Sequence, residues 1–446
     1  MSGYTRPGVG KPHRNSAARL LSLCPCTHAG PVGASACALC QWRRANTGSA
    51  AATRSGGNRR SCGRRQAART DQSSGHGQCA PCNHGRIRMP APLTDTPEDG
   101  TREQWYVACT QKQLRQGKPY RATILGLNIV LFRQRSGQAA ALLDQCVHRG
   151  TRLSAGKITD DCLVCPYHGW RYDASGHVVH IPSVDAEQGE PKSPGYRYRQ
   201  RHFAVCEQDG LVWVYTGTGN AHGTPIFRLP AYGERPWQSY FMINTFDADV
   251  GSLVQNFLDV PHTVFVHEGI FRSSSGRAME ATLACKAQSI EVVYHDEVDE
   301  IGLMQWLTNP DGEPLVHTDR FLAPNVTFCD YLWGARSGFL IVSQITPVNA
   351  RQSRVYTYIA YRFPMPRWVL RMLRPFIHLY THIVIQQDVK IIRAHREGLD
   401  NVANFKPCNV PADAIHVGVE QLLAAVRRGE ALPEAQRRER RIRFEL

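Results

Sequence analysis

The chain of 446 residues is long enough for two or three domains with separate buried cores. Its formal net charge is +15, but residues 1–88 hold 14 of the Lys and Arg residues and a single acidic residue. The rest of the chain carries 39 basic and 37 acidic residues. Its charge is therefore nearly balanced and does not require a nucleic acid or another polyanion as a partner. No apolar run is long enough for a transmembrane segment.

The segment 1–88 differs from the rest of the chain in composition. It is rich in Arg, Ser, Ala and Gly and contains 7 of the 15 Cys residues, so it cannot bury enough apolar surface to fold and is expected to be disordered. Two C-x2-C pairs, beginning at Cys37 and Cys79, suggest a zinc ribbon, and the Arg content is also typical of a transit peptide. We favour a third interpretation, in which Met89 is the functional initiator and the segment is not part of the mature protein. The later Cys residues are scattered and indicate no disulfide framework, which predicts a cytoplasmic protein.

Short strands are predicted from about Trp105 onwards. Residues 129–132 and 139–143 read as two strands joined by a turn, and they lead directly to Cys146. A second hairpin is predicted around Asp209-Gly210. These patterns predict an all-β domain over residues 102–217.

Two short motifs in this domain each pair one Cys with one His. Cys146 and His148 form C-x-H-R-G, and Cys165 and His168 form C-P-Y-H-G-W, with 16 residues between His148 and Cys165. A structural zinc site usually places both Cys residues on one loop and both His residues on the other. One Cys and one His on each loop instead favours a Rieske [2Fe–2S] cluster, in which two thiolates bind one iron and two imidazoles bind the other. A zinc loop is the alternative interpretation.

A second group of polar residues lies between residues 252 and 267. If 252–262 is helical, one polar stripe collects five residues on an otherwise apolar helix: Gln255, Asn256, Asp259, His262 and Thr263. Such a stripe indicates polar groups that face something inside the protein. His267 is five residues beyond His262, so it must come from the helix end or a following bend.

Strands are then predicted within residues 239–363, at the ranges 239–246, 289–294, 304–307, 325–333, 338–346 and 354–363. A helical run follows from Arg367, is interrupted at Pro375 and continues over 381–396. It contains Asp388, whose neighbours three and four residues away are all Val or Ile. A carboxylate among such residues is costly unless it is paired or bound to a metal, so a salt bridge is the alternative to metal ligation.

Two His and one carboxylate form the facial triad of non-haem Fe(II) oxygenases, which leaves coordination positions open for O2. His262, His267 and Asp388 supply that set. The predicted catalytic domain covers residues 224–432. Residues 433–446 are expected to be a basic tail that forms a solvated face or a subunit contact.

With both groups of residues in view, the chain from about residue 100 to 430 resembles the terminal oxygenase subunits of Rieske non-haem iron oxygenases, in particular the vanillate O-demethylase type. The resemblance rests on the two Cys-His motifs and on the N-x2-D-x2-H-x4-H run from Asn256 to His267. It implies an α+β chain with an all-β Rieske domain followed by a helix-grip, START-like domain that holds mononuclear iron. It also implies catalytic roles for Asn256 and Asp259. In a head-to-tail homotrimer, Asp259 would accept hydrogen bonds from His262 and from His168 of the adjacent subunit.

The resemblance further implies the reaction class. Such an enzyme takes electrons from a separate NAD(P)H-dependent flavin or ferredoxin reductase, consistent with the lack of a flavin, nicotinamide or plant-type ferredoxin motif in this chain. It uses O2 to hydroxylate or O- or N-demethylate an aromatic or other hydrophobic small molecule. A cis-dihydroxylating dioxygenase is one alternative, and a Rieske electron-transfer protein without oxygenase activity is an alternative of another class.

Overall fold

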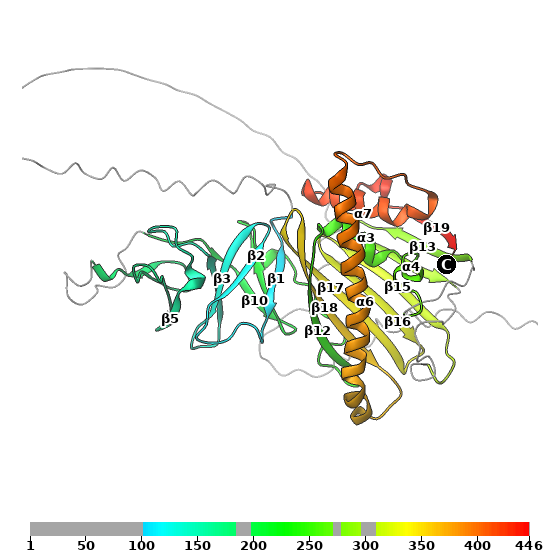
Figure 1. Cartoon of the computed structure of the whole chain (residues 1–446), viewed down its shortest axis with the longest axis horizontal. Helices are drawn as coiled ribbons and strands as arrows, with labels where there is room; N and C mark the ends of the chain where they lie inside the picture. Colours follow the sequence, from blue (N-terminus) through cyan, green and yellow to red (C-terminus); the bar gives the residue numbers. More distant parts are fainter. Residues whose placement is uncertain (1–100, 184–197, 271–277, 296–308, 446) are drawn as a thin grey trace, which may run out of the picture. The chain divides into compact units, whose positions relative to one another are not determined.

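A computed structural model describes residues 101–183, 198–270, 278–295 and 309–445 (Figure 1). The segment 1–88 and the strand predicted at 304–307 lie outside these ranges. Among the helices of the described ranges, none is both long and apolar enough to cross a membrane.

Three antiparallel sheets form the N-terminal part of the described chain. Their strand orders are β1-β11-β10, β2-β3-β4-β9 and β5-β6-β7-β8. The strands are β1 (Trp105–Thr110), β2 (Tyr120–Ile124), β3 (Leu127–Arg133), β4 (Ala139–Leu143), β5 (Lys157–Thr159), β6 (Cys162–Val164), β7 (Arg171–Tyr172), β8 (Val178–His180), β9 (His202–Phe203), β10 (Val205–Gln208) and β11 (Leu211–Tyr215). The prediction of an all-β region is confirmed, and the predicted hairpin turn at Asp209-Gly210 has both residues at positive φ.

A single eight-stranded antiparallel sheet dominates the C-terminal part, in the order β12-β18-β17-β16-β15-β14-β13-β19. The strands are β12 (Gln238–Phe246), β13 (Ala278–Cys285), β14 (Ser289–His295), β15 (Leu315–Leu322), β16 (Val326–Trp333), β17 (Ser337–Asn349), β18 (Gln352–Arg362) and β19 (Glu439–Glu445). The segment expected to be a basic tail therefore ends in a strand of this sheet, and its arginines are exposed, as expected for a solvated face. Residues 439–445 pair with β13 at the edge of the sheet, because Ile442 and Phe444 alternate with arginines and turn their apolar side chains into the core.

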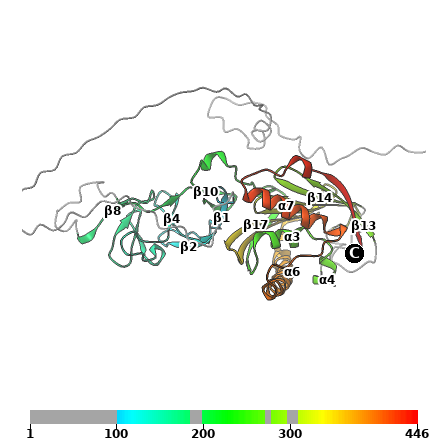
Figure 2. The same ribbon diagram turned by 90° about the horizontal axis from the view of Figure 1, so that it is seen from above.

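In the ranges that the structure describes, four α-helices accompany this sheet: α3 (Val250–Leu258), α4 (Thr263–Val266), α6 (Arg367–Asn401) and α7 (Ala414–Arg427). Helices α3 and α7 lie side by side and pack on the sheet through a core that includes Leu253, Val254, Val419 and Leu422 (Figures 1 and 2). Helix α6 lies across the strands (Figure 1) and contacts them through Leu370, Ile377 and Ile385.

Helix α6 is continuous, so the predicted interruption at Pro375 is wrong. A proline within a helix removes one N–H and leaves the carbonyl four residues earlier without its helical partner. Both Pro375 and Arg371, which carries that carbonyl, are exposed, so water can satisfy the carbonyl. The uninterrupted helix carries Asp388 over the sheet.

The opposite face of the large sheet packs against the N-terminal region. Val107 and Trp213 share a core with Val342 and Tyr358 of the large sheet. Tyr356 also donates a hydrogen bond from its hydroxyl to the carbonyl of Ala108 at 2.7 Å. The other face of the large sheet, which α3 and α6 cover, is the one that adjoins the candidate iron site.

Candidate metal centres

The two Cys-His motifs fold into matching loops. In each loop the Cys N–H donates to the carbonyl five residues later, and the Gly four residues after the Cys donates back to the Cys carbonyl. The donor and acceptor pairs are Cys146 to Thr151 at 2.8 Å, Gly150 to Cys146 at 2.9 Å, Cys165 to Trp170 at 2.9 Å and Gly169 to Cys165 at 3.1 Å. Gly150 and Gly169 have φ of 76° and 69°, a conformation that favours glycine. The R-G and H-G steps of the two motifs therefore close equivalent turns.

These loops bring the four predicted cluster ligands together. The rings of His148 and His168 have centroids 4.5 Å apart, and His148 stacks on Trp170 at 4.7 Å with an interplanar angle of 4°. Both Cys side chains are buried, and Nδ1 of His148 is a buried atom without a hydrogen-bond partner in the described part of the chain. Two buried thiols and two adjacent imidazoles, one with a buried ring nitrogen that lacks a partner, are the donor set of a [2Fe–2S] cluster held by two Cys and two His.

The pKa of Cys165 fits the same interpretation. Burial raises this pKa, and the neighbouring Cys146 thiol raises it further, because two adjacent thiolates would repel each other. A metal cluster supplies the positive charge that deprotonates such thiols.

Tyr172 is a residue of this centre that the sequence interpretation missed. Its hydroxyl oxygen lies 3.1 Å from Sγ of Cys146 and accepts a hydrogen bond from the N–H of Val147 at 3.1 Å. The hydroxyl has one proton, so with the Val147 N–H as a donor it is free to donate that proton to sulfur. The only signal in the sequence is its place on the strand that follows the second motif.

The second centre is formed by His262, His267 and Asp388. The possible ligand atoms of these residues all lie within 4.8 Å of one another. Oδ1 of Asp388 is 3.5 Å from Nε2 of His262 and 3.3 Å from Nε2 of His267. The two His residues flank the four-residue helix α4, and Asp388 reaches them from α6.

Hydrogen bonds hold each ligand of this centre in place. Nδ1 of His262 contacts the backbone oxygen of Asp259, and Nδ1 of His267 lies 2.9 Å from Oε1 of Gln387. Metal-binding imidazoles commonly donate their other ring N–H to such an oxygen, which turns Nε2 toward the metal. Nε2 of His262 is indeed buried and has no hydrogen-bond partner within the described ranges. The donor set therefore fits a divalent iron ion.

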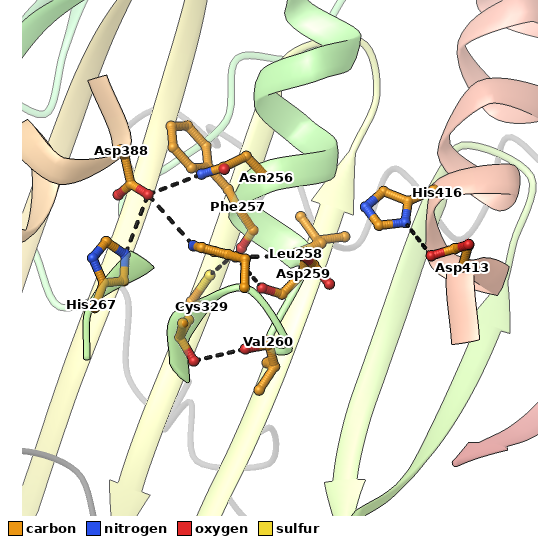
Figure 3. Close-up of polar contacts among 12 residues, drawn as sticks. Asn256, Phe257, Leu258, Asp259, Val260, His267, Cys329, Asp388, Asp413 and His416 are labelled. Carbon is orange, nitrogen blue, oxygen red and sulfur yellow. Dashed lines mark hydrogen bonds and ion pairs between the residues drawn. The ribbon is translucent and has the colours of Figure 1, made fainter. Parts of the chain in front are cut away.

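Asn256 completes this arrangement from α3. Its Nδ2 donates a hydrogen bond to Oδ1 of Asp388 at 3.1 Å, and Figure 3 shows Asn256 and His267 converging on the Asp388 carboxylate. Burial alone would raise the pKa of Asp388, but the nearby imidazoles of His262 and His267 stabilise its charged form and lower the pKa to about 2. Burial disfavours the charged form of His262, yet the nearby carboxylate of Asp388 raises the pKa of this imidazole.

The predicted helix over 252–262 is too long. Helix α3 ends at Leu258, and Asp259 is its C-cap. The reason is Pro261, because a proline disfavours the helical conformation of the residue before it. Gln255, within α3, points toward α7 instead, with its Nε2 3.2 Å from Oε1 of Glu420. The predicted stripe holds only in part.

Asp259 lies beside this centre and is partly exposed. Its carboxylate is 3.7 Å from Nδ1 of His262, longer than a hydrogen bond, because that ring nitrogen contacts the Asp259 backbone oxygen instead. The predicted hydrogen bond from His262 to the carboxylate is therefore absent within this subunit. Burial raises the pKa of Asp259. The charge of His416, a residue of α7, acts in the opposite direction and limits this rise.

A cavity of about 130 Å³ adjoins the His262, His267 and Asp388 side chains. Its other walls come from the large sheet, α3 and α6 and are mostly apolar, with Phe257, Phe339 and Ile359 among them. A small molecule held here would lie beside the triad and away from bulk water.

Two family models match separate parts of the chain. The Rieske [2Fe-2S] domain matches residues 104–204, and the vanillate O-demethylase oxygenase C-terminal domain matches residues 246–429. The first range contains both Cys-His loops, and the second contains all three residues of the triad.

Several named proteins with similar sequences are oxygenases. The oxygenase component of dicamba O-demethylase from Stenotrophomonas maltophilia is 33% identical over 254 residues, which cover 55% of this chain and 68% of the relative. Aminopyrrolnitrin oxygenase PrnD from Pseudomonas fluorescens is 34% identical over 171 residues, which cover 36% of this chain and 45% of that protein.

Solved structures show the same fold. The crystal structure of dicamba monooxygenase bound to dicamba matches with a TM-score of 0.62 and 21% identity, over 73% of this chain and 97% of that chain. Pseudomonas putida CBB5 NdmA with caffeine matches with a TM-score of 0.58 and 20% identity, over 73% of this chain and 91% of that chain.

Proposed function

The chain belongs to the Rieske non-haem iron oxygenases, and on that premise we propose that it hydroxylates, or removes an O- or N-methyl group from, an aromatic or other hydrophobic small molecule. As a terminal oxygenase it is an oxidoreductase, and its family uses a [2Fe–2S] cluster and a mononuclear iron. When bound, the cluster supplies single electrons and the Fe(II) supplies open coordination positions for O2.

One observation carries the proposal. His262, His267 and Asp388 place their ligand atoms within 4.8 Å of one another at the wall of a largely apolar cavity. An electron carrier has no need for a buried facial triad beside a cavity. An oxygenase needs both, because its substrate must be held near the iron.

The assignment of each residue follows from its surroundings. Cys146, His148, Cys165 and His168 would hold the cluster, and His262, His267 and Asp388 would hold the iron. Asn256 orients the Asp388 carboxylate through its hydrogen bond. The apolar walls exclude water, so a reactive oxidant meets the substrate before it meets solvent.

Asp259 and His168 would connect the two centres between subunits. His168 is exposed at the tip of its loop, and the Asp259 side chain is 24% exposed. A neighbouring subunit can therefore bring its His168 to this carboxylate in a head-to-tail homotrimer. Asp259 would accept that hydrogen bond, while its backbone oxygen holds the His262 ring. A separate NAD(P)H-dependent reductase would supply the electrons.

Product analysis tests this function. The purified enzyme, with a surrogate reductase, NADH and O2, should convert members of a panel of methoxyarenes and N-methyl heterocycles. Mass spectrometry should show a gain of one oxygen or the loss of a methylene. A gain of two oxygens would instead identify a dioxygenase, and no product from any compound, with both metal centres loaded, would contradict the proposal.

A further inference from the structure

A row of three hydroxyl groups crosses the sheet side of the cavity. Thr327 of β16 pairs with Ser343 of β17, and Ser343 pairs with Thr357 of β18. Directly opposed residues of neighbouring antiparallel strands point to the same face of the sheet. All three residues line the cavity, and each is at most 5% exposed. We call Thr327, Ser343 and Thr357 the hydroxyl row.

The neighbouring rows of the same wall are apolar. Two residues along each strand, Cys329, Ile341 and Ile359 form the next row in the same register, and all three line the cavity. Phe339 belongs to the row after that and also lines it. Tyr331, which pairs with Phe339, also lines the cavity, so outside the hydroxyl row the sheet wall is aliphatic and aromatic apart from the Cys329 thiol and the Tyr331 hydroxyl. An apolar ring packs against the rest of the wall.

The hydroxyl row has hydrogen-bonding capacity to spare. Oγ of Ser343 and Oγ1 of Thr357 are 3.5 Å apart, so one of these hydroxyls donates to the other. Each hydroxyl has one proton and two lone pairs. Their mutual bond uses a single proton, which leaves the second proton and several lone pairs for a ligand group. Because a buried polar group without a partner is costly, a polar substrate atom here is favoured.

The charges around the cavity decide which kind of polar group fits. Among the described residues that line it there is no Lys or Arg, and Asp388 is the carboxylate. An anionic substrate group placed at the hydroxyl row would have no cation from these residues to balance it. Burial of an unpaired charge costs far more than burial of a neutral group that is hydrogen-bonded.

We infer that the substrate is a neutral compound with an apolar ring and one hydrogen-bonding group, a hydroxyl or a carbonyl, which the hydroxyl row binds. Ser343 and Thr357 are then specificity-determining residues that position the ring in the cavity. This inference rests on the proposed oxygenase function, because it assigns the substrate class of the same site.

Calorimetric titration of the full, metal-loaded chain without reductase tests the inference by binding alone. The neutral probes are 2-methoxyphenol and 2-methoxyacetophenone, and the anionic probe is 2-methoxybenzoate. Methoxybenzene serves as the neutral probe without the hydrogen-bonding group. The neutral hydrogen-bonding probes should bind at least about 10-fold more tightly than the carboxylate.

Variants then locate the contact. Ser343→Ala and Thr357→Val should each raise the Kd of the hydrogen-bonding probes about 3- to 10-fold and leave methoxybenzene binding unchanged. Ser353→Ala is the matched control, since Ser353 is a buried serine of the same sheet whose hydroxyl donates to the Ala248 carbonyl at 2.9 Å. Ser353→Ala should change neither the Kd of the hydrogen-bonding probes nor the Kd of methoxybenzene.

Three results would overturn the inference. They are tighter binding of 2-methoxybenzoate, no binding by either neutral hydrogen-bonding probe, and an equal loss of affinity for all probes in the variants. Failure of the proposed function is separate, because it would appear as tight binding of the neutral probes with no product after reductase and O2 are added.

Discussion

Asn256 and Asp388 are joined by a hydrogen bond of 3.1 Å, although 132 positions of the chain separate them. The bond links the last turn of α3 to the middle of α6, and its acceptor, Oδ1, is the oxygen that faces both His residues of the triad. It therefore fixes the carboxylate relative to the segment that carries His262 and His267.

Asn256→Ala should weaken iron binding at the triad about 10- to 100-fold, because partners of metal ligands commonly contribute that much. Iron titration of the metal-free protein measures the change. Gln255→Ala is the matched control, since its neighbouring amide contacts α7 instead, and it should bind iron normally. Equal iron affinity in the Asn256→Ala variant and the wild type would contradict this role.

Asp259→Ala should leave both metal centres loaded and lower coupled turnover on the order of 100-fold, because the carboxylate proposed to join the subunits is lost. The readouts are iron and sulfide content together with product per NADH consumed. Asp413→Ala, which removes a carboxylate near His416 on α7, should retain turnover. Unchanged turnover in the Asp259→Ala variant would remove the bridge assignment.

Gly169→Ala should reduce the amount of assembled cluster. A Cβ at this φ of +69° costs about 1–2 kcal/mol and would meet Cγ of Pro182 at 3.1 Å. Gly137→Ala has the same kind of backbone penalty at φ +88°, but nothing lies within 4 Å of its added Cβ and it is in a hairpin turn. It should assemble the cluster normally. Visible absorption and acid-labile sulfide report the difference, and equal assembly in both variants would contradict the predicted loop geometry.

Tyr172→Phe should lower the reduction potential of the cluster by roughly 20–60 mV, since a hydrogen bond to the sulfur of Cys146 favours the more negative reduced state by about 0.5–1.5 kcal/mol. Redox titration followed by absorption or paramagnetic resonance measures it. Tyr167→Phe is a control on the exposed tip of the second loop and should leave the potential unchanged. A potential that stays the same in Tyr172→Phe would show that the hydroxyl does not donate to sulfur.

Local patterns in the sequence predict the ligands of both centres because ligand type and spacing are local properties. Three local features identify these ligands: the two Cys-His motifs, the pair His262 and His267, and the carboxylate of Asp388 among apolar helical neighbours. Gln387 and Tyr172 could not be found by this route, because their roles depend on which strand or helix the fold places beside them.

The hydroxyl row and the pairing of β19 depend on register between distant strands. Thr327, Ser343 and Thr357 become one group only when β16, β17 and β18 are aligned. The end of α3 is closer to a local property, because Pro261 disfavours the helical conformation of Val260 just beyond the helix end at Leu258. Pro375 inside the continuous helix α6 shows that a proline alone does not decide where a helix ends.

Iron and acid-labile sulfide analysis of anaerobically purified protein tests the central claim most directly. Two irons in the cluster and one at the triad predict about three irons and two sulfides per chain, and Asp388→Ala should retain about two irons with both sulfides. Two irons with full sulfide in the wild type, or three irons in the Asp388→Ala variant, would contradict the triad as the mononuclear iron site.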